Sequence, residues 1–178
     1  MDGVLKVMTQ GNEFHIPLEI DPRYFRTVLG HYPTGVCVIT GLNPNGQASG
    51  LVVGSFTSVS LDPPLVAFFP DRKSTTWPLL KESGHFCVNV LAEDQLDLCK
   101  QFARSGGDKF TGVSHYHSER GIPILDDIVA HIECVLDKEI ETGDHTIVLG
   151  RVLSLATVRA ANPLLFLKGG YGRFQKFD

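Results

Sequence analysis

The sequence lacks long apolar runs and a strong excess of either charge. None of its apolar stretches approaches the ~20 residues of a membrane-spanning helix, and its N-terminus lacks the basic-then-apolar layout of a signal peptide. The formal net charge of −4 provides no basic surface for nucleic acid or for an anionic membrane. We therefore expect a cytoplasmic protein that binds neither nucleic acid nor membranes.

Cysteine is scarce as well. Cys37, Cys87, Cys99 and Cys134 lie far apart and form no Cys-x-x-Cys pair, which argues against a zinc site or a redox pair. Three of them lie inside apolar strand-like runs, so we expect buried, reduced thiols. The metal-like spacing His115-Tyr116-His117 has no Cys, Asp or Glu pattern to support it. We predict a surface segment there and no metal site.

Motifs of several enzyme classes are also missing. A Gly-x-Gly-x-x-Gly sequence after a first strand is absent, as is the alternation of strands and helices, so any nucleotide is not bound in the Rossmann manner. The chain has no Ser-His-Asp layout and no nucleophile elbow. Its 178 residues, 43% hydrophobic and 20% charged, suit one globular domain with a hydrophobic core.

The pattern that is present predicts a mainly β chain with short helices. Asp21-Pro22 starts a helix that ends at Gly30, and two further helices are expected over 77–81 and from 94 to about 103. Strands are expected over residues 36–40, from about 47 into 50–61, and over 65–69, 86–91, 128–136, 145–158 and 164–167. This order predicts a β-rich barrel with helices packed outside it.

The first twenty residues differ from the rest. Residues 1–20 are mixed in character, and we expect an N-terminal arm that is either loosely ordered or clasps a partner. No linker, repeat or low-complexity tract divides the remainder. We therefore expect residues 21–178 to form a single domain.

The stretch Gly50–Val66, GLVVGSFTSVSLDPPLV, mixes small and hydroxyl residues with apolar β-formers, and Asp62-Pro63-Pro64 ends it. An ordinary core strand does not need so many hydroxyl groups. Glycines permit a close approach of the backbone, and hydroxyls and free N–H groups supply donors, which suits a flat polar ligand. The alternative is a solvent-facing strand edge.

This stretch resembles the short-chain flavin reductases, together with PTGVCVIT before it and HFCVNVLAEDQ and GDHTIVLGRV after it. The resemblance runs from about Asp21 to Arg173. It implies a split β-barrel with short flanking helices, usually a homodimer with flavin at the subunit boundary. It also implies hydride transfer from NADH or NADPH to FAD or FMN. The reduced flavin would then pass to a separate monooxygenase, for example one that hydroxylates an aromatic compound.

The resemblance also implies where the flavin ring binds. In the family, the central stretch lines the isoalloxazine with backbone amides and hydroxyls, whose donors stabilise the negative charge that appears on reduction. In the family, threonine is common at the position of Val52, and serine or asparagine at that of Gly54. Backbone N–H groups should therefore supply more of the hydrogen bonds to the flavin in this chain. The residues expected to bind the ring are Val52, Val53, Gly54, Ser55, Phe56, Ser58, Val59 and Ser60.

Two other segments are candidates for the flavin's phosphate and ribityl groups. Residues 72–76 carry two cations and three hydroxyls before a helix, which suits a phosphate, although an exposed loop with a helix cap has the same pattern. The resemblance assigns flavin contacts to Lys73, Ser74 and Thr75. Asp108-Lys109-Phe110 alone is a generic turn, and a similar motif lies near the flavin in the family.

The nicotinamide side is expected at two further segments. His145 lies at the hairpin corner Gly143-Asp144-His145, and the resemblance places it against the nicotinamide as the catalytic residue. It could orient the carboxamide or supply a proton, and we favour orientation. The segment that follows the last strand could be a mobile cover over the dinucleotide or a frayed tail. Its candidate binding residues are Lys168, Gly169, Tyr171 and Arg173.

Two rival functions remain open from the sequence. One is a reductase that holds its flavin permanently and acts on a bound acceptor. The other is a non-catalytic flavin- or haem-binding module on the same barrel, since a fold does not determine a function. A pure binding module would need neither a histidine on the nicotinamide side nor a cationic cover, so Gly143-Asp144-His145 and the segment from Lys168 favour an enzyme.

Overall fold

The computed structural model describes residues 3–177 and is mainly β, with three short α-helices. The helices are α1 (Pro22–Leu29), α2 (Trp77–Leu80, continued by a 3-10 turn over Lys81–Ser83) and α3 (Leu96–Ala103). The strands are β1 (Val4–Thr9), β2 (Asn12–Pro17), β3 (Thr34–Gly35), β4 (Cys37–Leu42), β5 (Ala48–Val53), β6 (Thr57–Leu61), β7 (Pro64–Phe68), β8 (His85–Val90), β9 (His115–His117), β10 (Pro123–Leu125), β11 (Ala130–Thr142), β12 (His145–Thr157), β13 (Leu164–Leu167) and β14 (Gly170–Arg173). Among the helices of residues 3–177, none has the length and apolarity needed to cross a membrane.

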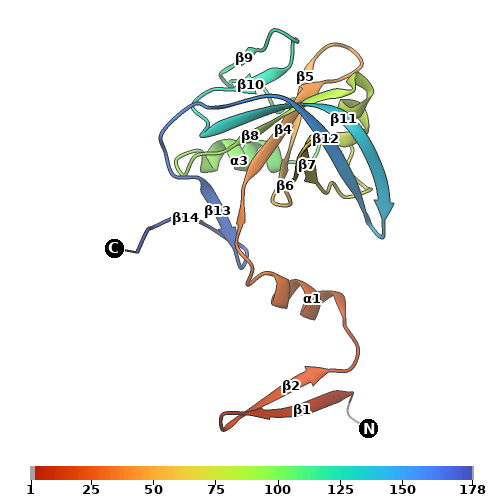
Figure 1. The fold of residues 1–178 in the computed structure, drawn as a ribbon, viewed down its shortest axis with the longest axis vertical. Helices are drawn as coiled ribbons and strands as arrows, with labels where there is room; N and C mark the ends of the chain where they lie inside the picture. Colours follow the sequence, from red (N-terminus) through yellow and green to blue (C-terminus); the bar gives the residue numbers. More distant parts are fainter. Residues whose placement is uncertain (1–2, 178) are drawn as a thin grey trace.

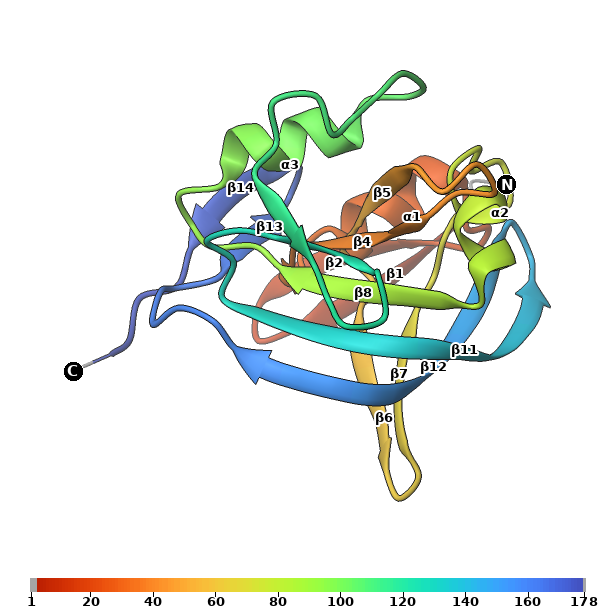
Figure 2. The same cartoon turned by 90° about the horizontal axis from the view of Figure 1, so that it is seen from above.

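Seven strands form one antiparallel sheet in the order β5-β4-β8-β11-β12-β7-β6 (Figures 1 and 2). The long β11–β12 hairpin contains two register shifts, which let these strands bend around the body as Figure 2 shows. The edge strands β5 and β6 are joined by only three residues, Gly54–Phe56, so the sheet must curl until its edges come near each other. Within residues 3–177 these two edges do not pair.

The core lies in two buried clusters on the two sides of the curled sheet. Phe68, Trp77 and Phe86 pack edge to face in one of them, with ring centroids 5.0 to 5.9 Å apart. In the other, Phe102 of α3 lies against β5 at Gly50, where a β-carbon would come within 2.8 Å of its ring. These contacts fix the start of α2 and the end of α3 on either side of β5.

The chain before and after the large sheet forms smaller units. β3, β13 and β14 form a three-stranded sheet, and β1 and β2 form a hairpin that projects away from the body beyond α1 (Figure 1). Helix α1 begins as its sequence predicts, since Asp21 Oδ1 accepts hydrogen bonds from the backbone N–H groups of Arg23 and Tyr24 at 2.7 and 3.0 Å. None of its residues is buried in the single chain.

Most predicted elements are confirmed, and all four cysteines are buried and unpaired as expected. Burial raises the pKa of the Cys37 and Cys134 thiols to about 12. The central stretch, however, is two strands with a break at Gly54–Phe56. Gly170–Arg173 is a paired strand rather than a frayed tail. In the predicted surface segment, Tyr116 and His117 are exposed, but the ring of His115 packs against Phe110 at 4.9 Å.

Candidate functional site

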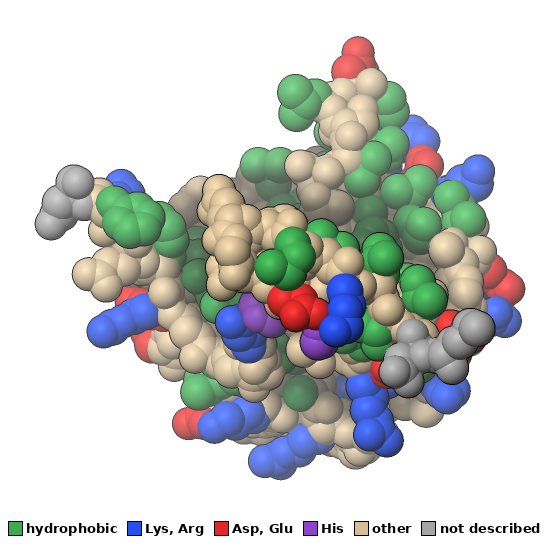
Figure 3. Space-filling model, turned by 90° about the horizontal axis from the view of Figure 1, so that it is seen from below, with side chains coloured by type: hydrophobic (Ala, Val, Ile, Leu, Met, Phe, Trp, Pro, Cys, Tyr) green, Lys and Arg blue, Asp and Glu red, His purple; other side chains and the backbone are tan. Residues whose placement is uncertain are grey.

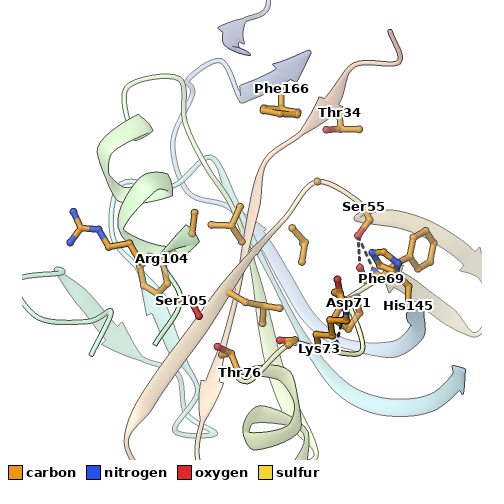
Figure 4. A pocket seen from close by; sticks show the side chains of 18 of the residues that line it. Thr34, Ser55, Phe69, Asp71, Lys73, Thr76, Arg104, Ser105, His145 and Phe166 are labelled. Atoms are coloured by element: carbon orange, nitrogen blue, oxygen red, sulfur yellow. Dashed lines mark hydrogen bonds between the residues drawn. The ribbon is translucent and has the colours of Figure 1, made fainter. Parts of the chain in front are cut away.

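A cavity of about 620 Å³ opens beside the break between β5 and β6 (Figure 4). Phe166 and Thr34 lie at one end of the view, Arg104 and Ser105 on one side, and Ser55 and His145 on the other. The lining comes from segments far apart in sequence, namely Leu29, Gly30, Tyr32, Thr34, Leu51, Val52, Val53, Gly54, Ser55, Phe69, Pro70, Asp71, Lys73, Ser74, Thr75, Thr76, Phe102, Ala103, Arg104, Ser105, Lys109, His145 and Phe166.

The break supplies backbone donors to this cavity. Among residues 3–177, the N–H groups of Gly54, Ser55 and Phe56 donate to no protein acceptor. The Ser55 hydroxyl is occupied, because it accepts from the N–H of Phe69 at 2.9 Å and donates to the Phe69 carbonyl at 3.4 Å. That pair of bonds ties the break to the end of β7. At the break, the free donors are therefore backbone N–H groups rather than the Ser55 hydroxyl.

The loop before α2 is held against the hairpin corner that carries His145. The N–H of Arg72 donates to the Asp144 carbonyl at 2.9 Å, and the N–H of Thr146 donates to the Pro70 carbonyl at 3.0 Å. The Arg72 side chain is also engaged, since it lies 3.4 Å from Glu141 and donates to the Gly143 carbonyl. Two segments that the sequence separates by seventy residues thus form one wall of the site.

Lys73 follows Arg72 but has a different environment. The carboxylate of Asp71 accepts a hydrogen bond from the backbone N–H of Lys73 at 2.7 Å, which bends the loop. The ammonium group of Lys73 takes part in no ion pair within residues 3–177. Ser74 Oγ accepts a hydrogen bond at 3.2 Å from the N–H of Trp77, the first residue of α2. The loop therefore presents a free cation to the cavity and uses one of its hydroxyls for its own shape.

The Asp108-Lys109-Phe110 motif divides into three roles. Asp108 forms the turn by accepting from the N–H of Phe110 at 2.8 Å and from the Thr111 hydroxyl at 2.7 Å, while Phe110 is buried in the core. Only Lys109 reaches the cavity, where its Nζ donates to the Gly50 carbonyl at 3.1 Å. Burial lowers the pKa of Lys109. No carboxylate pairs with it among the described residues, so an anion in the cavity would be favoured.

His145 lies where the main cavity meets a smaller apolar one of about 410 Å³. Its Nδ1 is 2.7 Å from Asp144 Oδ1. This hydrogen bond, and to a smaller extent the electrostatic interaction with His145, holds the pKa of Asp144 below its usual range. The imidazole is half exposed, and within residues 3–177 its hydrogen bond is made by Nδ1. Ser55, Phe69 and His145 line both cavities, so they separate two adjoining binding spaces.

The structure brings together nine of the nineteen residues that the sequence and the resemblance assigned to binding. Those that line the cavity are Val52, Val53, Gly54, Ser55, Lys73, Ser74, Thr75, Lys109 and His145. Phe56, Ser58, Val59 and Ser60 do not line it, because the chain turns away after the break and β6 pairs with β7. Asp108 and Phe110 support Lys109 from behind.

The C-terminal candidates lie elsewhere. Tyr171 and Arg173 line a separate cavity of about 510 Å³ with Glu93 and Asp94, and Lys168 and Gly169 line neither. Cys99 Sγ and the Tyr171 hydroxyl are 3.5 Å apart, and this contact, together with burial, raises the pKa of Tyr171 to about 12. Of the three-stranded sheet, Thr34 and Phe166 are the members that line the main cavity.

Several lining residues were not predicted. Phe69 is the last residue of the predicted strand 65–69 and directly follows β7, and Arg104 and Ser105 follow α3, so both segments could have been suspected because they lie at element ends. Leu29 and Tyr32 carry no such signal, because only the tertiary fold brings the end of α1 to the cavity.

Comparison with known proteins gives consistent matches. The family described as "Flavin reductase like domain" matches residues 29–175. A "Flavin reductase" of Pseudomonas putida is 54% identical over 155 residues, covering 87% of this chain and 91% of the relative. The monooxygenase reductase subunit HsaB of Rhodococcus jostii is 47% identical, over 85% of this chain and 77% of that protein. "FMN reductase (NADH) SmoA" of Agrobacterium fabrum is 38% identical and spans 97% of this chain and 98% of its own length.

Two solved structures have the same fold. Nitrilotriacetate monooxygenase component B from Mycobacterium thermoresistibile superposes with a TM-score of 0.83 at 41% identity, covering 86% of each chain. The NADH:FAD oxidoreductase SgcE6 of Streptomyces globisporus, in complex with NAD and FAD fragments, gives a TM-score of 0.81 at 35% identity, over 88% of this chain and 96% of SgcE6.

Proposed function

This chain belongs to the family of flavin reductase like domains, and on that premise we propose that it uses NADH or NADPH to reduce FAD or FMN and releases the reduced flavin to a separate monooxygenase. It is an oxidoreductase whose cofactors are a flavin and NADH. The proposal concerns how this chain binds these cofactors and what becomes of the reduced flavin.

The observation that carries the proposal is the set of donors and cations around one cavity. Gly54 and Ser55, whose N–H groups are free, line the same cavity as Lys73 and Lys109, whose ammonium groups take part in no ion pair within the described residues. A flavin has a flat ring with carbonyl oxygens along one edge and a phosphate at the end of its ribityl chain. The donors suit the edge of the ring, and the cations suit the phosphate.

The break between β5 and β6 binds the ring. The N–H groups of Gly54 and Ser55 would donate to the edge on which negative charge accumulates, and would so stabilise the reduced form more than the oxidised form. The flavin supplies the redox chemistry, accepting a hydride and carrying two electrons onward. A β-carbon at Gly54 would lie 3.0 Å from Thr34 Oγ1, against another wall of the site, so a side chain there would need Thr34 to shift.

Lys73 and Thr75 hold the phosphate and ribityl end. Their loop is fixed by Asp71 and by the hairpin corner, so little conformational freedom is lost when the ligand binds. Lys109 supplies a second positive charge from the floor of the cavity, where it is hydrogen bonded to Gly50 and next to Thr76. Its partial burial strengthens its attraction for an anion.

His145 orients the nicotinamide. Its Nδ1 is held by Asp144, and its Nε2 remains available to the carboxamide of a ring bound in the adjoining apolar cavity. Phe69 and Ile147 provide apolar surface there. Correct stacking of the two rings is the main requirement for hydride transfer, so a residue that fixes the ring contributes through position.

The wider assembly is also part of the proposal. We infer a homodimer in which residues 21–178 form a split β-barrel domain and residues 1–20 an arm. The curled seven-stranded sheet with unpaired edges supports the barrel. Names of relatives, such as the reductase subunit HsaB, support delivery to a monooxygenase. We propose that the reduced flavin is passed to a monooxygenase that hydroxylates an aromatic compound.

Anaerobic reduction assays with each pairing of FAD or FMN with NADH or NADPH test the proposal. We expect the added flavin to be bleached with at least one pairing. Absence of reduction with all four would contradict it. If the purified protein is yellow, and added flavin does not raise its rate of NADH oxidation, the flavin is permanently bound and is not released to a partner.

A further inference from the structure

Two cations stand side by side at residues 72 and 73, but the side chain of Arg72 is directed to the hairpin corner rather than to the cavity. Its Nη1 donates to the Gly143 carbonyl at 3.4 Å, and its Nη2 lies 3.4 Å from Oε2 of Glu141 on β11. Lys73 lines the main cavity, whereas Arg72 does not. Binding of a flavin phosphate therefore does not account for Arg72.

The backbone beside Arg72 is joined to the same corner. Asp71 and His145 form an isolated antiparallel bridge, made by the two backbone hydrogen bonds described above between this loop and the hairpin. Because the neighbours of these two residues make the hydrogen bonds, the side chains of Asp71 and His145 lie close together. Figure 4 shows both on the same side of the cavity as Lys73. The backbone position of His145 thus depends on this loop.

This connection is small, because the bridge consists of one residue pair at an exposed corner. Pairings of this kind open at a low free energy. An exposed ion pair by itself adds little, and basic and acidic side chains are interspersed over the surface, as Figure 3 shows for the face seen from below. Arg72 differs because it also donates to the carbonyl of Gly143, two residues before His145. Its side chain closes the corner onto the loop.

We propose that Arg72 is a positioning residue for His145, which holds the hairpin corner against the loop so that the imidazole faces the nicotinamide. This inference rests on the proposed function, in which His145 orients the nicotinamide, and it adds the residue that fixes that orientation. Arg72 lines neither the main cavity nor the smaller apolar one, so it acts through His145. The flavin and the nicotinamide would then be bound by two parts of one joined unit.

The flavin side of the loop is fixed by other contacts. Asp71 accepts from the N–H of Lys73, and Nε1 of the buried Trp77 donates to Oε1 of Glu139 at 2.8 Å. The side chain of Arg72 takes part in neither hydrogen bond. A change at Arg72 should therefore affect the use of NADH more than the affinity for flavin.

Steady-state reduction of FMN or FAD by Arg72→Gln tests this inference, with Arg151→Gln as the matched control. Arg151 pairs with Asp137, also on β11, is 55% exposed against 51% for Arg72, and lines neither cavity. We expect Arg72→Gln to raise the KM for NADH about 3-fold, the upper part of the range for an exposed pair, with flavin affinity within ~2-fold. Arg151→Gln should match the wild type. If circular dichroism shows that Arg72→Gln does not fold, Glu141→Gln takes its place, with a smaller loss of the same kind.

A double-mutant cycle separates positioning from general destabilisation. Combined with His145→Ala, Arg72→Gln should have no further effect on the KM for NADH, because no imidazole remains to be positioned. Additive losses would overturn the inference. An effect of Arg72→Gln where His145→Ala has none would overturn it as well.

Amide hydrogen exchange in the flavin-free protein supplies a readout that does not depend on activity. The N–H of Thr146, which donates to the Pro70 carbonyl, should exchange at least ~5-fold faster in Arg72→Gln and at the wild-type rate in Arg151→Gln. Unchanged exchange in Arg72→Gln, in a protein whose wild type reduces flavin, overturns this inference alone. A wild type that reduces no flavin contradicts the proposed function, and the nicotinamide role of His145 and Arg72 with it.

Discussion

Two segments of this chain look alike in sequence and have different roles in the structure. Residues 50–56 and 168–173 both combine glycines with polar or aromatic residues, and the resemblance assigns both to nucleotide binding. The first borders the main cavity and leaves three N–H groups free. The second pairs its backbone with β13 and joins Tyr171 to Cys99, away from that cavity. Composition alone does not distinguish them.

The two segments differ in how many of their backbone N–H groups are already hydrogen bonded within the fold. A strand in a ladder has few donors to offer, whereas a break between two strands that cannot pair leaves its donors free. The break at Gly54–Phe56 exists because the curled sheet brings β5 and β6 near each other without joining them. Binding capacity here therefore follows from topology rather than from the number of polar residues.

The largest effect should come from the cations of the first region. Lys73→Ala should weaken FMN or FAD binding by about 1–3 kcal/mol, the range for a charge-assisted hydrogen bond, and should weaken riboflavin binding less. Arg173→Ala, a cation of the second region, is the matched control and should leave flavin affinity unchanged. Fluorescence titration measures each constant. If Lys73→Ala weakened the binding of FMN and of riboflavin equally, Lys73 would not bind the phosphate.

A glycine in each region gives a second pair. Gly54→Ala places a methyl group 3.0 Å from Thr34 Oγ1 and should reduce flavin affinity roughly 10-fold, because either the donors or the opposite wall must shift. Gly172→Ala meets no atom within 4 Å and needs no unusual backbone angle, so flavin affinity should stay within ~2-fold. A similar loss of flavin affinity in both variants would contradict the view that only the first region binds flavin.

His145→Ala tests the rim of the first region. Loss of one hydrogen bond to the nicotinamide should raise the KM for NADH, slow flavin reduction, or both, by about 5-fold, since such a bond contributes about 1 kcal/mol. Flavin affinity and thermal stability should change little. Anaerobic stopped-flow reduction at several NADH concentrations is the measurement, with the exposed His85→Ala as control. Wild-type rates and NADH dependence in His145→Ala would leave His145 as an ordinary turn residue.

Tyr171→Phe should have the smallest effect and only on stability. Removing the hydroxyl that Cys99 contacts should cost about 0.5 kcal/mol in unfolding free energy, with no change in flavin affinity. The pKa of Tyr171 is raised from 10.0 to about 12 in the folded state, so the folded chain holds this proton more tightly. Stability should therefore fall as pH rises from about 10 to about 12, and by less in the variant. Denaturant titrations across that range compare the two proteins.

The sequence predicted the elements better than the site. Periodicity and caps located α1 and the long strands, because these depend on neighbouring residues. The break inside the central stretch was missed, since the alternation continues across Gly54–Phe56 and only the curling of the sheet interrupts it. Lys73 and Lys109 were found from motif resemblance. Leu29 and Tyr32 were missed, because only tertiary packing brings them to the cavity.

Backbone amide NMR during a flavin titration tests the central claim most directly. The free N–H groups of Gly54, Ser55 and Phe56 should show large, saturable shifts as FMN or FAD is added, together with those of residues 73–76. The amides of Gly170–Arg173 should move little, because β14 lies outside the main cavity. Large shifts at Gly170–Arg173 with none at Gly54–Phe56 would contradict the account and return flavin binding to the C-terminal segment.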